Sequence, residues 1–245
     1  MIVIPMAGLS KRFMSAGYAV PKYMLEADGK SLFFFAVNSF KRYFSTEEFL
    51  FVCLDVQGTP EFVESEARAM GIEKYRVVVL KKPTRGQAET VYLGVQEANV
   101  DVDQSLIIFN IDTFRPGFKF PHEFNVNKID GYLETFVGSG KNWSNVLPSD
   151  RENYKVEITA EKQEISEFCC TGLYFWGKCS DFCSIFEGHV EKGLDAAQAG
   201  EFYIAPMYND LIKKGGDVRY SVIDQSDVIF CGVPSEYEGF LKRFQ

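Results

Sequence analysis

The chain has 245 residues, of which 46% are hydrophobic and 24% charged, a balance that excludes a disordered or collagen-like protein. A domain averages roughly 150 residues, so the length allows one large domain or two small ones. Lys and Arg number 26 against 34 Asp and Glu, and a net charge of −8 without a basic run argues against nucleic acid or a membrane surface as a partner.

The first 112 residues alternate strand-like and helix-like patterns. Short apolar runs typical of strands cover 2–4, 49–54, 76–80 and 106–109, and stretches typical of helices cover 32–43, 59–71 and 87–98. Thr59 is expected to cap its helix, with Pro60 in the first position and Gly71 at the end. This alternation predicts a mostly parallel sheet with helices on both faces.

The second half is richer in strands and is expected to continue the same sheet. Strands are predicted at 132–137, 155–159, 164–168, 173–176 and 218–223, and helices at 179–190, 202–214 and from Pro234 onward. No linker or repeat separates the halves, so we predict a single α/β domain over residues 1–245.

The N-terminal run and the cysteines both indicate a cytoplasmic protein. Residues 1–5 are apolar with no basic residue before them, so we interpret them as a strand rather than a signal peptide. No uncharged apolar run approaches the ~20 residues that span a bilayer. The six cysteines lack Cys-x-x-Cys pairs, which predicts reduced and mostly buried thiols. His122 and His189 stand alone and are interpreted as structural or surface residues.

Polar segments follow three of the predicted strands. They begin after Ile4, Leu80 and Phe109 and cover 6–13, 81–86 and 110–112. The carboxyl ends of parallel strands meet at one edge of a sheet, and ligands bind outside that edge. The three segments are therefore expected to share one rim.

The segment after the first strand combines small residues with two basic side chains: Ala7-Gly8-Leu9-Ser10-Lys11-Arg12-Phe13. A tight turn with exposed amides can cradle phosphate, to which Arg12 adds a planar fork and Lys11 a mobile charge. Lys22 follows Pro21, which stiffens its approach. On composition alone, an ordinary loop with surface lysines stays open as the alternative. A single glycine in this segment excludes the dinucleotide fingerprint.

Four ordered segments resemble nucleotidyltransferases of the sugar-nucleotide pyrophosphorylase type. They are 7–13 with Pro21-Lys22, Arg85-Gly86-Gln87-Ala88-Glu89-Thr90-Val91, Phe109-Asn110-Ile111-Asp112, and Glu161-Lys162 followed by Thr171-Gly172. The resemblance covers nearly the whole chain. It implies a Rossmann-like fold of the nucleotide-diphospho-sugar transferase kind, with a nucleotide-binding half at 1–125 and an acceptor-binding half at 126–245. It also implies that an acceptor phosphate attacks the α-phosphorus of an NTP and that pyrophosphate leaves.

On the nucleotide side, the resemblance assigns the loop from Ala7 through Lys11, with Arg12, to the triphosphate. It puts Lys22 near the transferred α-phosphate. Gly86, Gln87 and Ala88 would contact the base, although Gln87 could equally just begin a helix. Asp112 would bind Mg²⁺, a hard ion that suits one or two carboxylates together with phosphate oxygens. As a lone residue, Asp112 could also be a helix cap.

On the acceptor side, the resemblance implies that Lys162 grips the acceptor phosphate, with Glu161 and Gly172 as substrate-binding neighbours. Lys162 could instead be a solvated strand residue. Glu201 resembles the family's acceptor-facing glutamate, yet it could equally cap the helix that follows. Trp143 either lines the acceptor pocket or anchors its own loop.

Three departures from the family pattern matter. Ser10 stands where the first motif has its second glycine, and Gln163 stands where a proline is usual. Many sugar-phosphate members carry a second metal-binding Asp in a segment that here reads Val228-Ile229-Phe230-Cys231-Gly232-Val233-Pro234 and has no acidic residue. Asp224, at the end of a predicted strand, is our preferred replacement as second metal ligand, and Asp227 is the alternative.

These departures weaken the assignment to hexose 1-phosphates. The chain looks closer to short members from capsule and surface-polysaccharide loci, some of which use CTP, and one such type joins CTP to phosphoglutamine. Two alternatives stay open: a UTP- or dTTP-dependent sugar-1-phosphate nucleotidyltransferase, and an inactive nucleotide-binding regulatory subunit. A glycosyltransferase is disfavoured, because its usual Asp-x-Asp is Asn110-Ile111-Asp112 here. The resemblance makes a homodimer plausible.

Overall fold

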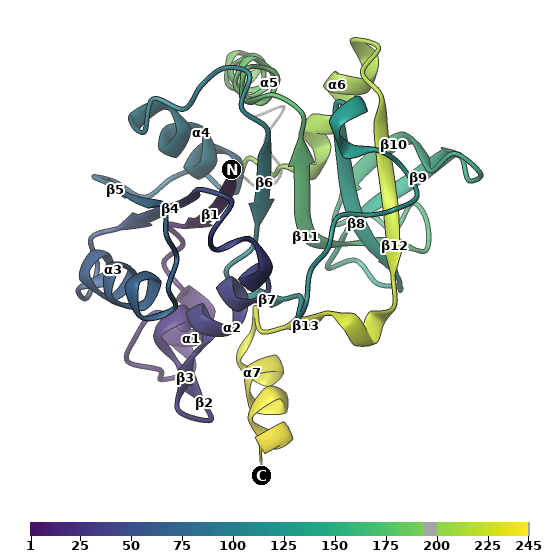
Figure 1. The fold of residues 1–245 in the computed structure, drawn as a ribbon. Coiled ribbons are helices and arrows are strands. Elements are labelled where there is room, and N and C mark those ends of the chain that lie inside the picture. The colour runs from purple at the N-terminus through teal and green to yellow at the C-terminus, as the bar shows by residue number, and fades with distance from the viewer. Residues whose placement is uncertain (194–199, 245) are drawn as a thin grey trace.

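A nine-stranded sheet runs through the residues that the computed structural model describes, 1–193 and 200–244 (Figure 1). The strand order is β5-β4-β1-β6-β11-β8-β12-β10-β9. These strands are β1 Ile2–Met6, β4 Phe49–Leu54, β5 Tyr75–Leu80, β6 Leu106–Phe109, β8 Gly131–Val137, β9 Ser144–Asp150, β10 Lys155–Glu161, β11 Phe168–Trp176 and β12 Val218–Ile223. Small two-stranded sheets join β2 (Glu26–Ala27) to β3 (Lys30–Ser31) and β7 (Thr113–Phe114) to β13 (Ile229–Phe230).

Strand β11 joins the two halves of the chain into one sheet. It pairs antiparallel with β6 on one side and with β8 on the other. Strands β5, β4, β1 and β6 pair in parallel, and so do β8 and β12. Only β10 and β11 run against the direction of the other main-sheet strands. The predicted mixed, mostly parallel α/β sheet is therefore confirmed.

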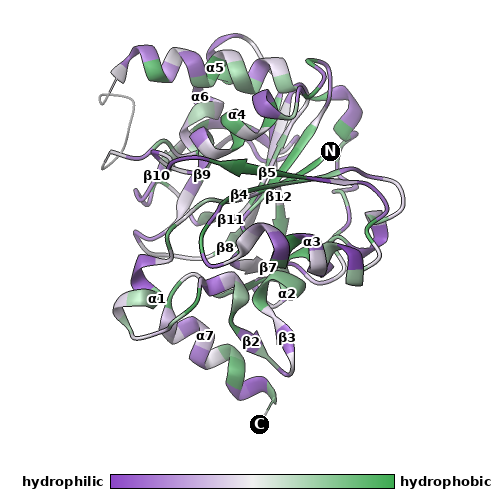
Figure 2. Ribbon diagram, turned by 90° about the vertical axis from the view of Figure 1, so that its left-hand side faces the viewer, coloured by the Kyte–Doolittle hydropathy of each residue, from purple (hydrophilic) through white to green (hydrophobic). Residues whose placement is uncertain are grey.

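Helices cover both faces of this sheet. One face carries α4 (Gln87–Glu97), α5 (Cys179–Glu191) and α6 (Tyr208–Lys213), and the other carries α2 (Leu32–Asn38), α3 (Thr59–Ala69) and α7 (Pro234–Leu241). The short α1 (Lys11–Ser15) follows β1. The 3₁₀ turns are η1 Lys22–Met24, η2 Lys41–Tyr43, η3 Val126–Lys128, η5 Ala205–Met207, η6 Gln225–Asp227 and η7 Lys242–Phe244. Figure 2 shows hydrophobic central strands between helices that are part polar.

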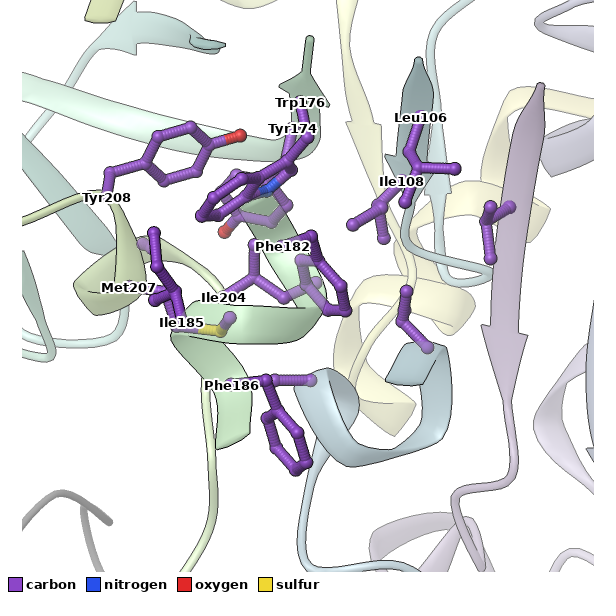
Figure 3. Packing of buried hydrophobic residues seen from close by; sticks show 14 of the residues in the cluster. Leu106, Ile108, Tyr174, Trp176, Phe182, Ile185, Phe186, Ile204, Met207 and Tyr208 are labelled. Atoms are coloured by element: carbon purple, nitrogen blue, oxygen red, sulfur yellow. The ribbon is translucent and has the colours of Figure 1, made fainter. Parts of the chain in front are cut away.

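The central strands are apolar throughout because both of their faces are buried. Successive side chains of a strand point to opposite faces, so Leu106 and Ile108 enter the core under α4 and α5. Ile107 enters the core on the opposite face. Figure 3 shows the first core, where Trp176 of β11 packs edge-on against Phe182 of α5 with ring centroids 5.3 Å apart. This packing holds the strand ends that form the rim.

Two predicted elements of the second half are wrong. Residues 164–167 do not form a strand, since 165–167 are bends, and β11 begins at Phe168 and continues to Trp176. The helix predicted at 202–214 begins as an α-helix only at Tyr208, after the turn η5. Residues 202 and 203 are not helical, and the amide of Phe202 instead donates to Arg85 O at 2.6 Å. Strand β9 was not predicted.

The cysteine and histidine predictions agree with the structure. All six cysteines are buried and free of disulfides. His189 is buried and contacts Asp210 at 2.8 Å, whereas His122 lies on the surface. Among the described residues, no helix is long and apolar enough to cross a bilayer.

Candidate active site

Lys22 and Asp112 form an ion pair at the carboxyl edge of the sheet. Lys22 begins η1, and Asp112 lies between β6 and β7. The Lys22 Nζ lies 2.5 Å from Asp112 Oδ2, and each side chain is about one-fifth exposed. The pair joins residues 90 positions apart in sequence. A lysine and a carboxylate are thus held together where they can meet a ligand.

Ser10, where the resemblance has a glycine, adopts a backbone conformation that glycine favours. Ser10 adopts the left-handed region with φ 50°, and its Oγ accepts a hydrogen bond from Lys22 N at 3.1 Å. The side chain therefore ties the loop to Lys22. Lys11 and Arg12 are exposed, and the first amides of a helix have no partner within it. These groups can receive an anion.

An apolar pocket of about 450 Å³ opens beside this loop, at the ends of β1, β4 and β5. Its lining residues are Leu9, Leu54, Asp55, Val56, Val79, Leu80, Lys81 and Pro83. Leu9 is 43% exposed and Val79 42% exposed, so apolar surface faces open space here. A flat aromatic group can cover such a surface, with polar groups of the rim fixing its orientation.

The start of α4 lies against a segment of the second half of the chain. Gly86 has a φ of +118°, and a Cβ there would come within 2.6 Å of the Phe202 carbonyl oxygen. The Ala88 amide donates to that same carbonyl at 3.1 Å. Ala88 is fully buried, so its amide serves a contact within the protein. The assignment of Gly86, Gln87 and Ala88 to the base stays a prediction.

Asn110 is a site residue that the sequence analysis did not single out. Its Oδ1 accepts a hydrogen bond from Gln87 Nε2, so the Gln87 amide is directed toward the end of β6. Its amide N donates to Gly172 O at 3.1 Å. The one available signal was its position two residues before Asp112. Asn110 thus connects the start of α4 with β11.

Gly172 makes room for Asn110, and this gives a testable prediction. Gly172 has a φ of +96°, and a Cβ there would lie 2.5 Å from Asn110 Nδ2. Gly172→Ala is expected to lower the free energy of unfolding by ~1–3 kcal/mol and to displace Asn110. Gly239→Ala is the control, because its Cβ would meet nothing within 4 Å, and it should be neutral or stabilising. Equal chemical-denaturation midpoints for Gly172→Ala and wild type would contradict this account.

The acceptor-side residues gather at the end of β10. Glu161 is 6% exposed and accepts a hydrogen bond from Ser144 Oγ. The Lys162 Nζ lies 4.0 Å from Glu161 Oε1 and donates to Tyr203 Oη at 2.6 Å. Tyr203 Oη in turn donates to Glu201 Oε2 at 2.5 Å. Lys162, Glu161 and Glu201 are therefore brought together as the resemblance implies, through a tyrosine that was not predicted.

Glu161 supplies a second testable prediction. Burial raises its pKa above the ordinary value, and the hydrogen bond from Ser144 opposes that shift. A carboxyl group whose pKa is raised by folding makes its full contribution to stability below its unfolded-state pKa. This contribution is lost as the pH rises through its folded-state pKa. The free energy of unfolding of wild type should therefore fall relative to that of Glu161→Gln as the pH rises above the ordinary pKa of glutamate. Urea unfolding of both proteins measures it, and a pH-independent difference would refute the burial argument.

The segment 228–234 lies directly beside Asp112. Strand β13 pairs with β7, and the Cys231 amide donates to Asp112 O at 2.8 Å. A Cβ on Gly232 would lie 3.1 Å from Asp112 Oδ2. Phe230, in the position of the family's second Asp, packs on Trp143 with ring centroids 4.5 Å apart. Trp143 thus contacts segment 228–234 through Phe230, and its carbonyl accepts the amide of Lys162, the residue after Glu161.

Asp224 is exposed and serves locally as a cap. Its Oδ1 accepts hydrogen bonds from the amide and the hydroxyl of Ser226 at 2.8 and 2.7 Å. It follows β12, which is three strand positions from β6, so the two strand ends are separated by about 14 Å. Its role as second metal ligand stays a prediction. Within the described residues, no three His, Cys, Asp or Glu side chains form a metal-binding group.

Comparisons with known proteins identify the family. The chain is 48% identical to a nucleoside-diphosphate-sugar pyrophosphorylase from Vibrio cholerae RC9, with a TM-score of 0.94 over 99% of this chain and 100% of that one. An inositol-1-phosphate CTP transferase from T. maritima (18% identity, TM-score 0.71, 96% and 89% covered) and a UDP-glucose pyrophosphorylase from Acinetobacter (14%, 0.70, 99% and 92%) share the fold.

Neither a scan against protein-family models nor a search of curated proteins finds a match. The likeness to the Vibrio structure extends over nearly the whole of both chains. The chain belongs to the nucleoside-diphosphate-sugar pyrophosphorylases and is a nucleotidyltransferase of that type.

Proposed function

We propose that this nucleotidyltransferase transfers an NMP from an NTP, with CTP as first choice, to a small phosphorylated acceptor and releases pyrophosphate. The observation that carries the proposal is the Lys22–Asp112 ion pair at the rim, whose Lys22 amide is hydrogen-bonded to Ser10 in the loop that holds Arg12. Residues 1–125 would bind the nucleotide and 126–245 the acceptor. By its resemblance to capsule-locus members, the enzyme would make precursors of surface polysaccharides.

The reaction brings two anions together, so positive charge and positioning supply most of the catalysis. Arg12 and the amides of its loop would hold the triphosphate, with the base in the apolar pocket beside Leu9. Lys22 would move from Asp112 to the α-phosphate and stabilise the charge that builds there. Lys162 would hold the acceptor phosphate, whose oxygen forms the new bond to phosphorus as the bond to pyrophosphate breaks.

The residues around Asp112 fit a magnesium ion. With Lys22 moved to the phosphate, Asp112 Oδ2 would be free for the ion, and Gly232 has no side chain to crowd it, since a Cβ there would lie only 3.1 Å away. A bound Mg²⁺ would neutralise phosphate charge, and one carboxylate with phosphate oxygens is a donor set that this ion accepts. Phe230 cannot coordinate a metal, so Asp112 would provide the ligand on this side of the site.

The aromatic pair of Phe230 and Trp143 bears on the choice of acceptor. Both rings are part exposed beside the Glu161–Lys162 turn. They would offer the acceptor an apolar wall where other members have a carboxylate. This supports a small acceptor other than a hexose 1-phosphate, and phosphoglutamine is our first candidate.

The test is pyrophosphate release from CTP, UTP, dTTP, ATP and GTP with Mg²⁺, against sugar 1-phosphates, phosphocholine and phosphoamino acids that include phosphoglutamine. Mass spectrometry identifies the conjugate in each active mixture. Turnover of CTP with phosphoglutamine alone is the expected result. Turnover of CTP with another non-sugar acceptor would keep the reaction and replace the acceptor.

A UTP- or dTTP-dependent sugar-1-phosphate nucleotidyltransferase is the second candidate. The Vibrio protein, 48% identical, is described as a nucleoside-diphosphate-sugar pyrophosphorylase, which favours a sugar phosphate as acceptor. Turnover of UTP or dTTP with a sugar 1-phosphate in the same panel would establish this candidate. Binding of an NTP without turnover of any mixture would instead indicate a regulatory subunit.

A further inference from the structure

Lys162, the predicted acceptor lysine, is held by a neighbour from another segment of the chain. Its ammonium donates to Tyr203 Oη at 2.6 Å and lies 4.5 Å from the centroid of that ring. The Tyr203 hydroxyl donates its own proton to Glu201 at 2.5 Å. The hydroxyl therefore stands between the ammonium and the Glu201 carboxylate.

This interposed hydroxyl keeps the charge of Lys162 available. An ammonium has three N–H donors, and Tyr203 takes one of them, so two can still bind phosphate oxygens. Glu161 Oε1 already lies 4.0 Å from this ammonium, and a direct ion pair with Glu201 would further neutralise the charge that a phosphate needs. Burial and the adjacent Glu201 raise the pKa of Tyr203, so its hydroxyl stays protonated and can donate to that carboxylate.

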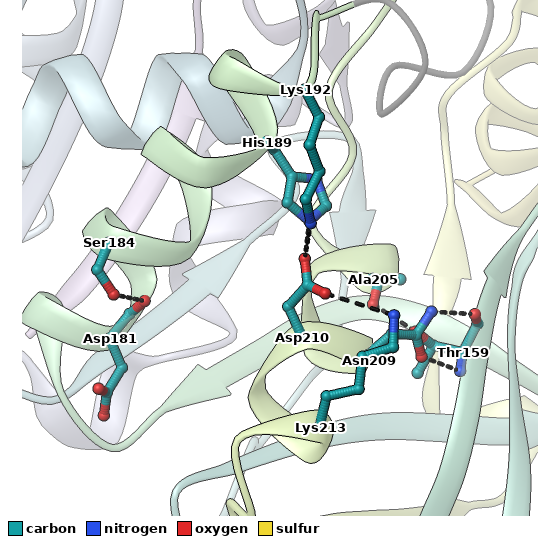
Figure 4. A network of polar contacts seen from close by, with 9 residues as sticks. All are labelled: Thr159, Asp181, Ser184, His189, Lys192, Ala205, Asn209, Asp210 and Lys213. Carbon is teal, nitrogen blue, oxygen red and sulfur yellow. Dashed lines mark hydrogen bonds and ion pairs between the residues drawn. The ribbon is translucent and has the colours of Figure 1, made fainter.

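The backbone on both sides of this contact is fixed. Lys162 has a φ of 53°, a left-handed conformation that is uncommon outside glycine, and its amide donates to Trp143 O at 2.9 Å. Farther along the other segment, Asn209 Oδ1 accepts the amide of Thr159 on β10 at 2.8 Å (Figure 4). Its Nδ2 donates to Thr159 O at 2.9 Å. The two segments that meet at Lys162 are thus anchored to each other.

The same segment is joined to the nucleotide half of the chain. Phe202, next to Tyr203, hydrogen-bonds through its N–H and C=O to Arg85 and Ala88, the residues that flank Gly86 and Gln87. The Arg85 guanidinium also lies 5.1 Å from the Phe202 ring centroid. The tyrosine that holds the acceptor lysine is therefore one residue away from a clamp on the predicted base-binding turn.

We propose that Tyr203 is a positioning residue that holds the Lys162 ammonium ready for the acceptor phosphate. This inference rests on the proposed transfer to a phosphorylated acceptor. Tyr203 acts through Lys162, so the loss of its hydroxyl should impair use of the acceptor while binding of NTP alone is retained. The ring of Tyr203→Phe keeps the packing and removes only the hydrogen bonds.

The kinetic test compares Tyr203→Phe with Tyr92→Phe, a matched control whose hydroxyl donates to Glu187 on the surface at 2.8 Å. We expect Tyr203→Phe to lower kcat/KM for the acceptor about tenfold, a typical effect of losing a hydrogen bond to a charged group. The calorimetric Kd for NTP alone should stay at the wild-type value. Tyr92→Phe should match wild type in both, and equal kinetics of the two variants would overturn the proposal.

A double-mutant cycle tests whether Tyr203 acts through Lys162. In a Lys162→Met background, Tyr203→Phe should cause no further loss, because residues that act as a unit are not additive. Additive losses would mean that Tyr203 has a separate role and would overturn the proposal.

A third measurement does not depend on turnover. Lysines labelled by ¹³C-methylation give separate NMR signals, and the Lys162 signal is the one absent from Lys162→Arg. Tyr203→Phe should shift this signal, whereas Tyr92→Phe should not. If wild type turns over no NTP and acceptor pair, the proposed function fails, and an unshifted signal would then overturn the positioning role as well.

Discussion

Asp112→Ala is expected to lower kcat by about 10²–10³-fold or more, since it removes the carboxylate at the point where charge develops. The fold should survive, because a part-exposed ion pair contributes only about 0–1 kcal/mol to stability. Asp103→Ala is the matched control: it removes the carboxylate of a surface ion pair, in which Lys178 Nζ lies 3.0 Å from Asp103 Oδ1. Steady-state kinetics and thermal unfolding of both variants provide the measurement.

Full activity of purified Asp112→Ala would exclude this residue as the metal ligand. If Asp112→Ala loses both its activity and its folded state, Asp112→Asn tests the assignment instead, because it keeps the shape of the side chain. That variant is also expected to be at least about 10²-fold slower than wild type.

Lys22→Ala is expected to reduce kcat by about 10²–10³-fold, because the cation proposed to stabilise the charge on the α-phosphate is lost. Lys178→Ala, the other half of the control pair, should behave like wild type. The double variant Asp112→Ala with Lys22→Ala should be little slower than the slower single variant, since both residues serve the same charged centre. Activity of Lys22→Ala within about threefold of wild type would contradict its placement at the transferred phosphate.

The rim could be predicted from the sequence because it depends on local patterns. Each apolar run buried on both faces is recognisable as a strand, and polar residues that follow parallel strands must share an edge. This reasoning brought Asp112 and the loop around Ser10 to the same region. The ion pair of Lys22 with Asp112 and the hydrogen bond of Lys22 with Ser10 were not predictable. Both depend on the exact path of the chain between distant segments.

Strand β11 shows where local reasoning failed. Gly172 has a positive φ, and the register of β11 against β8 shifts between Cys170 and Tyr174. Such a glycine looks like a break between two strands, whereas the strand continues through an irregularity. Gly172 lies beside Asn110 at this irregularity. The position where the predicted strand was wrongly interrupted is therefore next to the candidate site.

The helix prediction around Tyr203 was wrong for a different reason. The apolar and polar residues of this segment fit a helical pattern, yet Phe202 uses its backbone groups to bind Arg85 and Ala88 instead. A tertiary contact thus overrides the local preference.

The central claim is that residues of both halves form one site for transfer of a nucleotidyl group. Its most direct measurement follows pyrophosphate and conjugate together, with Mg²⁺ and the NTP, in the presence and in the absence of the phosphorylated acceptor. The account predicts that both products form in equal amounts and that neither forms without the acceptor. Pyrophosphate release that continues without acceptor, or NTP binding that never leads to release with any acceptor, would contradict it.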